Sequence, residues 1–388
     1  MKYKGLFKTA AFLLLLIFTL SCLNQWYSIP QSYISRHMRA FEQESKNTVD
    51  GIVIGTSVVA YAWVPTVAYT ESGVAAYHLG SNVQPFGATI PLIEYAKKTQ
   101  DIKYAIIDIH GMRVSAIKNS CKSGNIKNLY CNIPNASARK KILNGVLDYV
   151  DRVYEYYGQP ENSEDVVDRS DISYKIPFIN LHNRWVDGLV KSDFTSPVNR
   201  FKGANDRKGL CFSSVDCTKL AYMWEAEPAE VDDFQKQELQ RVFDYLEENN
   251  IKAVFINLPS FRKVESQQEL AGLIAYCREK GYDAIDFSSE QMLRETGIKL
   301  DKDFVNTGHL NSSGAVKVSK YMARYLVENG YATEDHRGQE GYESWDKTAE
   351  EYQKFYDAGW KEAESAKKSK SGQIGQIANK SSIISKKF

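Results

Sequence analysis

Short apolar runs of strand length alternate along this chain with longer segments of helical periodicity. The apolar runs lie at residues 50–55, 75–80, 104–109, 252–257 and 282–287. The segments that suit helices lie at residues 85–98, 138–157, 232–249, 266–280 and 312–328. Strands that alternate with helices form a parallel sheet with right-handed crossovers. The sequence therefore predicts an α/β fold, a doubly wound and mainly parallel sheet flanked by helices, whose ligands bind at the carboxyl ends of the strands.

Composition and charge exclude two classes of protein. The chain has 388 residues, of which 43% are hydrophobic, so it can bury a core and is not wholly disordered. Its length fits one large domain with insertions or two domains. The 49 Lys and Arg residues balance 48 Asp and Glu residues, which leaves a net charge of +1. No overall field attracts such a protein to nucleic acid, so we predict no nucleic-acid partner.

Residues 1–27 are typical of a segment that directs a protein to or across a membrane. Three lysines within the first eight residues precede an apolar run at residues 9–20. Three outcomes are open: a retained signal anchor, a lipoprotein acylated at Cys22, or a cleaved signal peptide. The basic start predicts that the N-terminus lies inside and that everything after residue 27 lies outside, on the extracytoplasmic face of the membrane.

The spacing of the cysteines along the sequence is consistent with export. Two local disulfides could form in an oxidising compartment, one between Cys121 and Cys131 and one between Cys211 and Cys217. Cys277 would then remain as a buried thiol. The alternative is that all of them are reduced. No histidine lies close to either pair and neither pair has CxxC spacing, so we expect no metal, and the sequence indicates no cofactor.

The predicted α/β domain spans residues 50–330 and is followed by a segment of different composition. Residues 158–230 lack clear periodicity, so we interpret them as a large insertion. Within residues 331–388, aromatic residues between Trp345 and Trp360 recur at near-helical spacing, which predicts one or two amphipathic helices. From Ser365 onward the residues are mainly Lys, Ser, Gly, Gln and Asn, which predicts disorder.

Two residues with catalytic chemistry follow predicted strands. Ser57 comes two residues after the run at 50–55, where the start of a helix would leave N–H groups free to stabilise an oxyanion. A serine nucleophile needs a base, and histidine is the usual one. Among the six histidines His309 stands out, because it lies in a polar loop between the last strand and the final helix. We expect Ser57 and His309 to lie within hydrogen-bonding distance at the carboxyl edge of the sheet.

Four segments resemble, in order, the motifs of one superfamily. They are GTS at 55–57, HLGSNVQ at 78–84, PFINLHNRW at 177–185 and NTGHLN at 306–311. This set resembles the SGNH/GDSL hydrolases, and more closely their exported, membrane-anchored bacterial branch related to the D-alanyl-lipoteichoic acid transfer protein. That branch typically has Gly-Ser-Ser-His-Ala, Asn-Leu-Gly-Ser-Ser-x-Gln, Pro-Leu-Leu-x-x-His-Ser-Arg-Trp and Asp-x-x-His-Leu-Asn. The resemblance covers about residues 50–328 and implies an SGNH, flavodoxin-like arrangement of the sheet.

The resemblance implies that Ser57 is the nucleophile and His309 its base. Asn306 stands where these enzymes have the aspartate that orients the imidazole and stabilises its charged form. Asparagine can orient a histidine but supplies no negative charge, so activity is in doubt. Asp301 or Asp303, from the same loop, could take the role of that aspartate.

The same resemblance implies an oxyanion hole. The N–H of Ser57 or Val58 would form it together with Gly80, and Asn82 or Gln84 could add a side-chain donor. The alternatives are that Gly80 is a turn glycine and that Asn82 and Gln84 cap the next helix.

Three further residues are candidates for the site. Arg184, in the third segment, could pair with an anionic group of the substrate, or the segment could serve to pack a loop. Asp108 and His110 stand where the superfamily has Gly-x-Asn-Asp, and they could belong to the site or be structural.

Two functions remain open. The first is an exported serine esterase or acyltransferase that acts on acyl esters of a cell-envelope glycan or teichoic-type polymer, with a membrane acyltransferase as a further partner. The second is a weak or inactive envelope protein that binds a glycan or a membrane partner through the cleft and the aromatic C-terminal segment. The pairing of Ser57 with His309 favours the first, and Asn306 favours the second.

Overall fold

A five-stranded parallel sheet forms the centre of the protein. The computed structural model describes residues 2–27, 32–181, 186, 198–206, 211–224 and 226–384. The strands of the sheet are β1 (Gly51–Ile54), β2 (Ala76–His78), β3 (Tyr104–Asp108), β4 (Lys252–Asn257) and β5 (Asp283–Asp286). Their order is β2-β1-β3-β4-β5, and every neighbouring pair is parallel. Each strand lies within a predicted apolar run, so the predicted α/β class and parallel sheet are confirmed.

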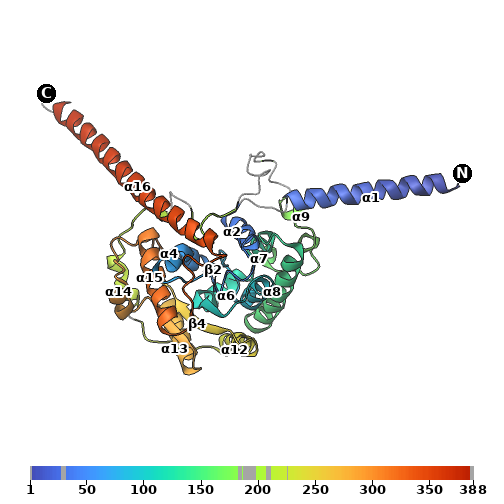
Figure 1. The fold of residues 1–388 in the computed structure, drawn as a ribbon, viewed down its shortest axis with the longest axis horizontal. Helices are drawn as coiled ribbons and strands as arrows, with labels where there is room; N and C mark the ends of the chain where they lie inside the picture. The colour runs from blue at the N-terminus through green and yellow to red at the C-terminus, as the bar shows by residue number, and fades with distance from the viewer. Residues whose placement is uncertain are drawn as a thin grey trace.

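Helices cover both faces of this sheet (Figure 1). Ile52 and Ile54 of β1 belong to one apolar cluster, whereas Val53 between them belongs to another. Successive side chains of a strand point to opposite faces, so the two clusters lie on opposite sides of the sheet. The first cluster draws on α2 (Tyr33–Glu42), α5 (Thr89–Ala96), α6 (Val114–Ser120), α7 (Ser123–Cys131), α8 (Ala136–Tyr157), α12 (Asp233–Glu248) and α13 (Val264–Glu279). The second draws on α3 (Ser57–Ala62), α4 (Pro65–Ser72), α14 (Glu290–Thr296) and α15 (Ser312–Glu328).

The strand order reverses between β1 and β3, and this reversal marks a position for a ligand. The chain leaves β1 into α3 on one face of the sheet, and it leaves β3 toward α6 on the other face. In open α/β sheets the loops that diverge at such a point leave a crevice at the carboxyl ends of the strands, where ligands bind.

A small hairpin follows β5 and carries the polar loop that was expected there. It consists of β6 (Phe304–Asn306) and β7 (His309–Leu310), which pair antiparallel. Phe304 is buried against Phe261 with ring centroids 5.2 Å apart, and the Phe261 N–H donates to the Thr307 carbonyl at 2.6 Å. These contacts hold the hairpin against the segment that follows β4.

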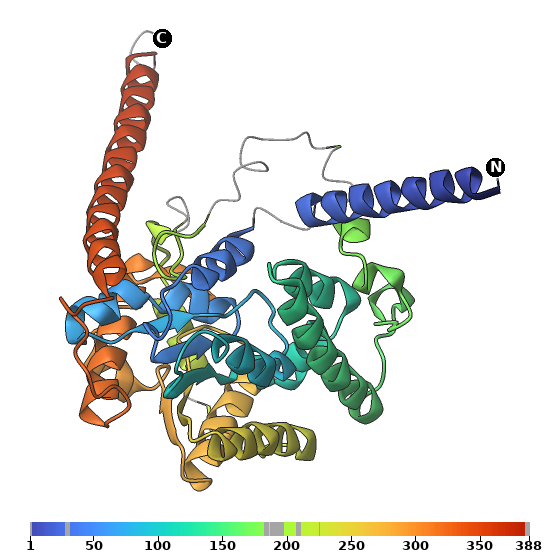
Figure 2. The ribbon, with the colours of Figure 1, turned by 45° about the vertical axis from the view of Figure 1, so that its right-hand side comes forward.

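The N-terminal helix α1 (Lys2–Tyr27) projects away from the body of the protein (Figures 1 and 2). Its span Tyr3–Cys22 has 20 residues with a mean hydropathy of 2.0 and none of it is buried, so it is long and apolar enough to cross a membrane. The short helix α9 (Phe178–Leu181) lies beside it in both views.

The predicted insertion contains little regular structure among its described residues. Besides α9, it holds the short turns η3 (Ser163–Asp165), η4 (Ile172–Tyr174) and η6 (Thr218–Trp224). Such short elements have no sequence period, which explains why none could be predicted.

The C-terminal segment packs on the body through one long helix, α16 (Glu343–Ile384). Trp345 is completely buried, and its ring stacks on Tyr69 of α4 with centroids 5.4 Å apart. Further along α16, Phe355 packs on Phe201 at 5.0 Å. The first turns of the helix are therefore part of the core, and the rest projects outward (Figure 2).

The helix α16 also extends through the residues from Ser365 onward that we predicted to be disordered. Lys, Gln and Ala occur repeatedly there, and these residues favour helix when a folded turn precedes them. The amphipathic helices predicted before this point form one continuous helix.

The predicted disulfides are absent, because all six cysteines are free thiols. Cys211 and Cys217 belong to different apolar clusters, which explains why they do not pair. Cys121 follows the end of α6 and Cys131 ends α7, and burial raises the pKa of each thiol, to about 12 and about 11. Cys277 is the buried thiol that was expected.

Candidate active site

Ser57 is the first residue of α3, directly beyond the carboxyl end of β1. The preceding residue, Thr56, donates from both its backbone N–H and its Oγ1 to Asp108 Oδ2, at 3.3 and 3.2 Å. This pair of hydrogen bonds joins the loop after β1 to the end of β3. Gly55 permits the close approach, because a β-carbon on it would lie 2.5 Å from the β-carbon of Asp108. Ser57 is thereby held at the point where the strand order reverses.

His309 lies next to Ser57, with Ser57 Oγ and His309 Nε2 2.9 Å apart. The hairpin places His309 at the start of β7. The ring of Tyr61, one turn after Ser57 in α3, packs on the imidazole with centroids 4.5 Å apart. The two residues therefore lie at the distance expected from the sequence, while their catalytic roles stay predictions.

Asn306 determines which nitrogen of His309 carries the proton. Asn306 Oδ1 lies 3.1 Å from His309 Nδ1 and also accepts the Gly308 N–H at 2.8 Å. The Gly308 N–H needs an acceptor, so the amide oxygen rather than the NH₂ faces the loop. That oxygen in turn requires a proton on His309 Nδ1, so in the neutral ring Nε2 is the acceptor for the Ser57 hydroxyl. This assignment follows from the hydrogen-bond network, and it is the tautomer that a general base needs.

Asp303 does not take the role of the missing aspartate. It is buried, and its Oδ2 accepts from Lys317 Nζ and from the Lys299 N–H, each at 2.6 Å. Asp301 lies exposed in the turn before the hairpin. The side chain that meets His309 Nδ1 from this loop is Asn306.

Asp108 fixes the loops around the site. Besides Thr56, it accepts the N–H of His110 at 3.1 Å, so three hydrogen bonds end on this buried carboxylate. Burial raises the pKa of Asp108 to about 6, although the hydrogen bonds from His110 and Thr56 lower it. Burial, reinforced by Arg113, lowers the pKa of His110 well below its usual value, so this histidine is neutral.

Two arginines that the sequence analysis did not single out flank His110. Arg262 Nε donates to His110 Nε2 at 3.2 Å, and Arg113 Nε donates to the His110 carbonyl at 3.1 Å. Burial and then the neighbouring Arg262 lower the pKa of Arg113 to about 10, and burial lowers that of Arg262. Each arginine lies five residues beyond the end of its strand, Arg113 after β3 and Arg262 after β4. This shared spacing is the sequence signal that could have identified the two arginines, because it brings both of them to the same edge of the sheet.

A cleft of about 350 Å³ opens beside Ser57. Its lining includes Thr56, Ser57, Gln84, His110, Arg113 and Arg262. Gln84 is buried, and its Oε1 has no hydrogen-bond partner within the part of the chain that the structure describes. Val83 also lines the cleft and has a φ of 50°, a strained value for a β-branched residue that is more frequent at functional sites.

The other predicted site residues lie outside this lining. Gly80 is buried, and a β-carbon on it would lie 2.7 Å from the Gly55 carbonyl oxygen, so glycine is needed there for close packing. Asn82 is exposed. Arg184 lies outside the described residues. Among the described residues, Gln84 lines the cleft together with Ser57, and Gly80 packs against Gly55, two residues before Ser57.

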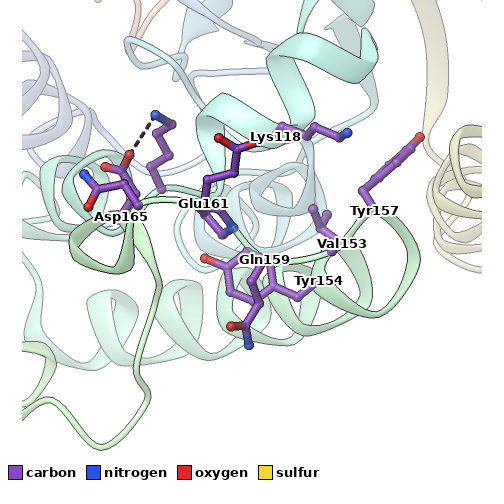
Figure 3. Close-up of a pocket in the computed structure, with 11 residues that line it drawn as sticks. Lys118, Val153, Tyr154, Tyr157, Gln159, Glu161 and Asp165 are labelled. Atoms are coloured by element: carbon purple, nitrogen blue, oxygen red, sulfur yellow. Dashed lines mark hydrogen bonds and ion pairs between the residues drawn. The ribbon is translucent and has the colours of Figure 1, made fainter.

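A larger hollow, of about 450 Å³, lies on another side of α6 (Figure 3). Its lining includes Lys118 and Tyr157, with the Lys118 Nζ 5.3 Å from the Tyr157 ring centroid. It contains no pairing of a nucleophile with a base, so we assign the chemistry to the smaller cleft. No group of three or more His, Cys, Asp or Glu side chains that could hold a metal occurs in the described part of the chain.

Comparison with models of known protein families finds no match, and comparison with curated proteins finds none either. The function is therefore inferred from the geometry of the site.

Proposed function

We propose that this protein is a membrane-attached serine esterase or acyltransferase of SGNH type. The observation that carries the proposal is the 2.9 Å contact between Ser57 Oγ and His309 Nε2 at the carboxyl edge of a parallel sheet. This arrangement activates serine nucleophiles: a neutral imidazole accepts the hydrogen bond of the hydroxyl, and a third side chain orients the other ring nitrogen.

The geometry supports acyl transfer in two steps. Ser57 Oγ attacks the ester carbonyl carbon while His309 Nε2 accepts the hydroxyl proton, which gives a tetrahedral oxyanion. The N–H groups of Ser57 and Val58, in the first turn of α3, have no acceptor within the helix and can donate to that oxyanion. The ester C–O bond then breaks, the alkoxide takes the proton from His309, and the acyl group remains on Ser57.

The second step determines whether the protein hydrolyses or transfers. Water, or a hydroxyl of an acceptor, gives its proton to His309 Nε2 and attacks the acyl-enzyme. The bond to Ser57 Oγ then breaks, Ser57 Oγ takes the proton back from His309 Nε2, and a carboxylic acid or a new ester is released. Both outcomes use the same residues.

The membership of the SGNH superfamily is part of the proposal. The strand order 2-1-3-4-5 and the positions of Ser57 after β1 and His309 before α15 support it. The chain departs from that superfamily at two places. Asn306 stands in place of the aspartate, and Asp108 with His110 stands in place of Gly-x-Asn-Asp.

We further propose that α1 anchors the protein and that the catalytic domain lies on the extracytoplasmic face of a bacterial membrane. The basic residues before the apolar span support this orientation. The substrate would then be an acyl ester of an envelope glycan or teichoic-type polymer, and a membrane acyltransferase is the partner that would supply acyl groups.

Hydrolysis of p-nitrophenyl acetate by the purified protein tests the proposal. The wild type should release nitrophenol above the buffer rate, and Ser57→Ala should abolish that release. Ser163→Ala, which changes an exposed serine far from the cleft in sequence, is the matched control and should leave the rate unchanged. Equal rates for the wild type and Ser57→Ala would refute a serine enzyme.

Asn306 favours a second function, that of a binding protein on a hydrolase fold. An amide beside His309 Nδ1 adds no negative charge to stabilise an imidazolium. In this alternative the cleft binds a glycan or a membrane partner without turnover. The aromatic residues of α16 contribute less to such binding than the sequence suggested, because Trp345, Tyr352 and Phe355 are buried in the body.

A further inference from the structure

Arg113 and Arg262 converge on one point of the cleft from two different loops. Each donates from Nε to His110, which fixes the plane of its guanidinium. Both arginines line the cleft that contains Ser57. Within the described part of the chain, neither guanidinium forms an ion pair, and no terminal nitrogen of either donates a hydrogen bond.

Carboxylates compensate this positive charge in part: Asp108 interacts with both arginines, and Glu269 interacts with Arg113. Two partly buried cations side by side repel each other and have lost part of their hydration. Asp108 is the carboxylate that interacts most directly with both. However, its oxygens already accept the hydrogen bonds from Thr56 and His110. The described lining of the cleft itself therefore contains two guanidinium groups and no carboxylate, and the terminal nitrogens of these groups are unused donors.

The position of Arg262 connects this charge with the reaction. A β-carbon on Gly308 would lie 3.2 Å from Arg262 Nη2, so the guanidinium lies against the residue that precedes His309. Ser57, which contacts His309, lines the same cleft. An anion bound by Arg262 would therefore lie close to the ester that Ser57 attacks.

We propose that Arg113 and Arg262 bind an anionic substituent, a carboxylate or a phosphate, of the acylated substrate. Arginine suits this task because its planar fork forms paired hydrogen bonds with the oxygens of either group. The inference rests on the proposed esterase function and specifies its substrate class as esters of an acidic polymer rather than of a neutral glycan.

Paired esters that differ only in charge test the inference. Acetylated glycerol phosphate is compared with monoacetylglycerol, and acetylated glucuronic acid with acetylated glucose. We expect kcat/KM to be about tenfold to a hundredfold higher for the anionic member of at least one pair, as for hydrogen bonds to charged groups. The pair that shows the preference identifies the substituent as phosphate or carboxylate.

Variants then assign the preference to the two arginines. Arg113→Gln and Arg262→Gln should each reduce the ratio of kcat/KM between anionic and neutral ester, mainly by raising KM for the anionic one. Arg262→Lys should restore part of the ratio, because it keeps the charge and loses the fork. Arg294→Gln, on the exposed surface of α14, is the matched control and should keep the ratio. Circular dichroism checks that each variant is folded.

Two outcomes separate this inference from the proposed function. If the wild type hydrolyses anionic and neutral esters with equal kcat/KM, the inference is overturned while the esterase proposal stands. If no ester is hydrolysed, calorimetry with glycerol phosphate and glucuronate tests binding directly. Binding that Arg262→Gln abolishes would then support the anion site without the enzyme, and absence of binding would overturn it.

Discussion

Asn306 is the residue that most directly controls the reactivity of His309. Its Oδ1 lies 3.1 Å from His309 Nδ1 and accepts the Gly308 N–H, a bond that a carboxylate could accept equally well. Asn306→Asp should therefore keep the loop and add a negative charge beside the imidazolium that forms during attack. We expect kcat for p-nitrophenyl acetate to rise at least about tenfold, a modest part of the roughly 10⁴-fold effect of the reverse change in serine proteases.

Asn306→Ala is the companion variant for this prediction, and it should lower kcat, because Nδ1 would lose its acceptor. Asp303 is paired with Lys317 and does not supply the missing charge, so nothing in this hairpin should mask the gain. A rate for Asn306→Asp equal to that of the wild type would mean that the imidazolium is stabilised in some other way.

The site could be predicted from the sequence only in part. Ser57 and His309 were found because each occupies a recognisable position relative to a strand or the final helix. Arg113 and Arg262 were not, because an arginine in a loop is usually a surface residue. Their spacing after β3 and β4 places both at one edge of the sheet, but it does not show that the two loops converge on His110.

At the scale of elements, the central strands could be predicted because each is a short apolar run that is buried on both faces. The helix α2 was not predicted, although Ile34, Met38 and Phe41 recur in it at helical spacing and so gave a local signal. The hairpin strands β6 and β7 have three and two residues, too few for any period to appear. The aromatic face of α16 could be predicted from its helical spacing, but its contact with α4 could not, because the partner of that face is set by tertiary packing.

That contact leads to a prediction for stability. Trp345 is 0% exposed, stacks on Tyr69, and has Lys202 Nζ 4.9 Å from its ring centroid. Trp345→Ala would leave a large cavity between α16 and α4. We expect the free energy of unfolding to fall by about 3–5 kcal/mol, as for buried aromatic residues in general. Urea unfolding followed by circular dichroism measures this change.

Tyr222→Ala is a matched control for Trp345→Ala, because Tyr222 is 57% exposed and a surface truncation should change stability by less than about 0.5 kcal/mol. Equal effects of the two substitutions would mean that α16 does not contribute to the folded body.

At the scale of the whole molecule, buried histidines link stability to pH. Burial, reinforced by neighbouring positive charge, lowers the pKa of His37 and His110 well below its usual value, and burial lowers that of His78 to about 4. In the unfolded chain each of these imidazoles titrates near about 6.5. Below that pH the unfolded state binds more protons than the folded state, so stability falls as the pH falls.

The pKa shifts of His336 and Asp108 change the stability in the opposite direction to those of the three histidines, and the two groups act over different ranges of pH. His336 is buried and its pKa is raised by its hydrogen bond with Asp50, so its contribution is fully present below about 6.5 and is lost as the pH rises through its folded pKa. Asp108 has a pKa of about 6, so the folded state takes up a proton below that value and partly offsets the histidines.

The free energy of unfolding should therefore decrease as the pH falls from 6.5 toward about 5, because the three histidines lose stability from 6.5 downward. The carboxyl groups of Asp108, Glu44 and Asp286, whose pKa values burial raises, offset that loss only in part. Each titrating group contributes a slope of up to about 1.4 kcal/mol per pH unit. His37→Leu removes one of the three groups from the interior, and its slope in urea unfolding should be smaller by about that amount. His336→Gln should keep the wild-type slope below pH 6.5, because that histidine is protonated there in both states. Identical slopes for His37→Leu and the wild type would mean that His37 is not held neutral in the folded protein.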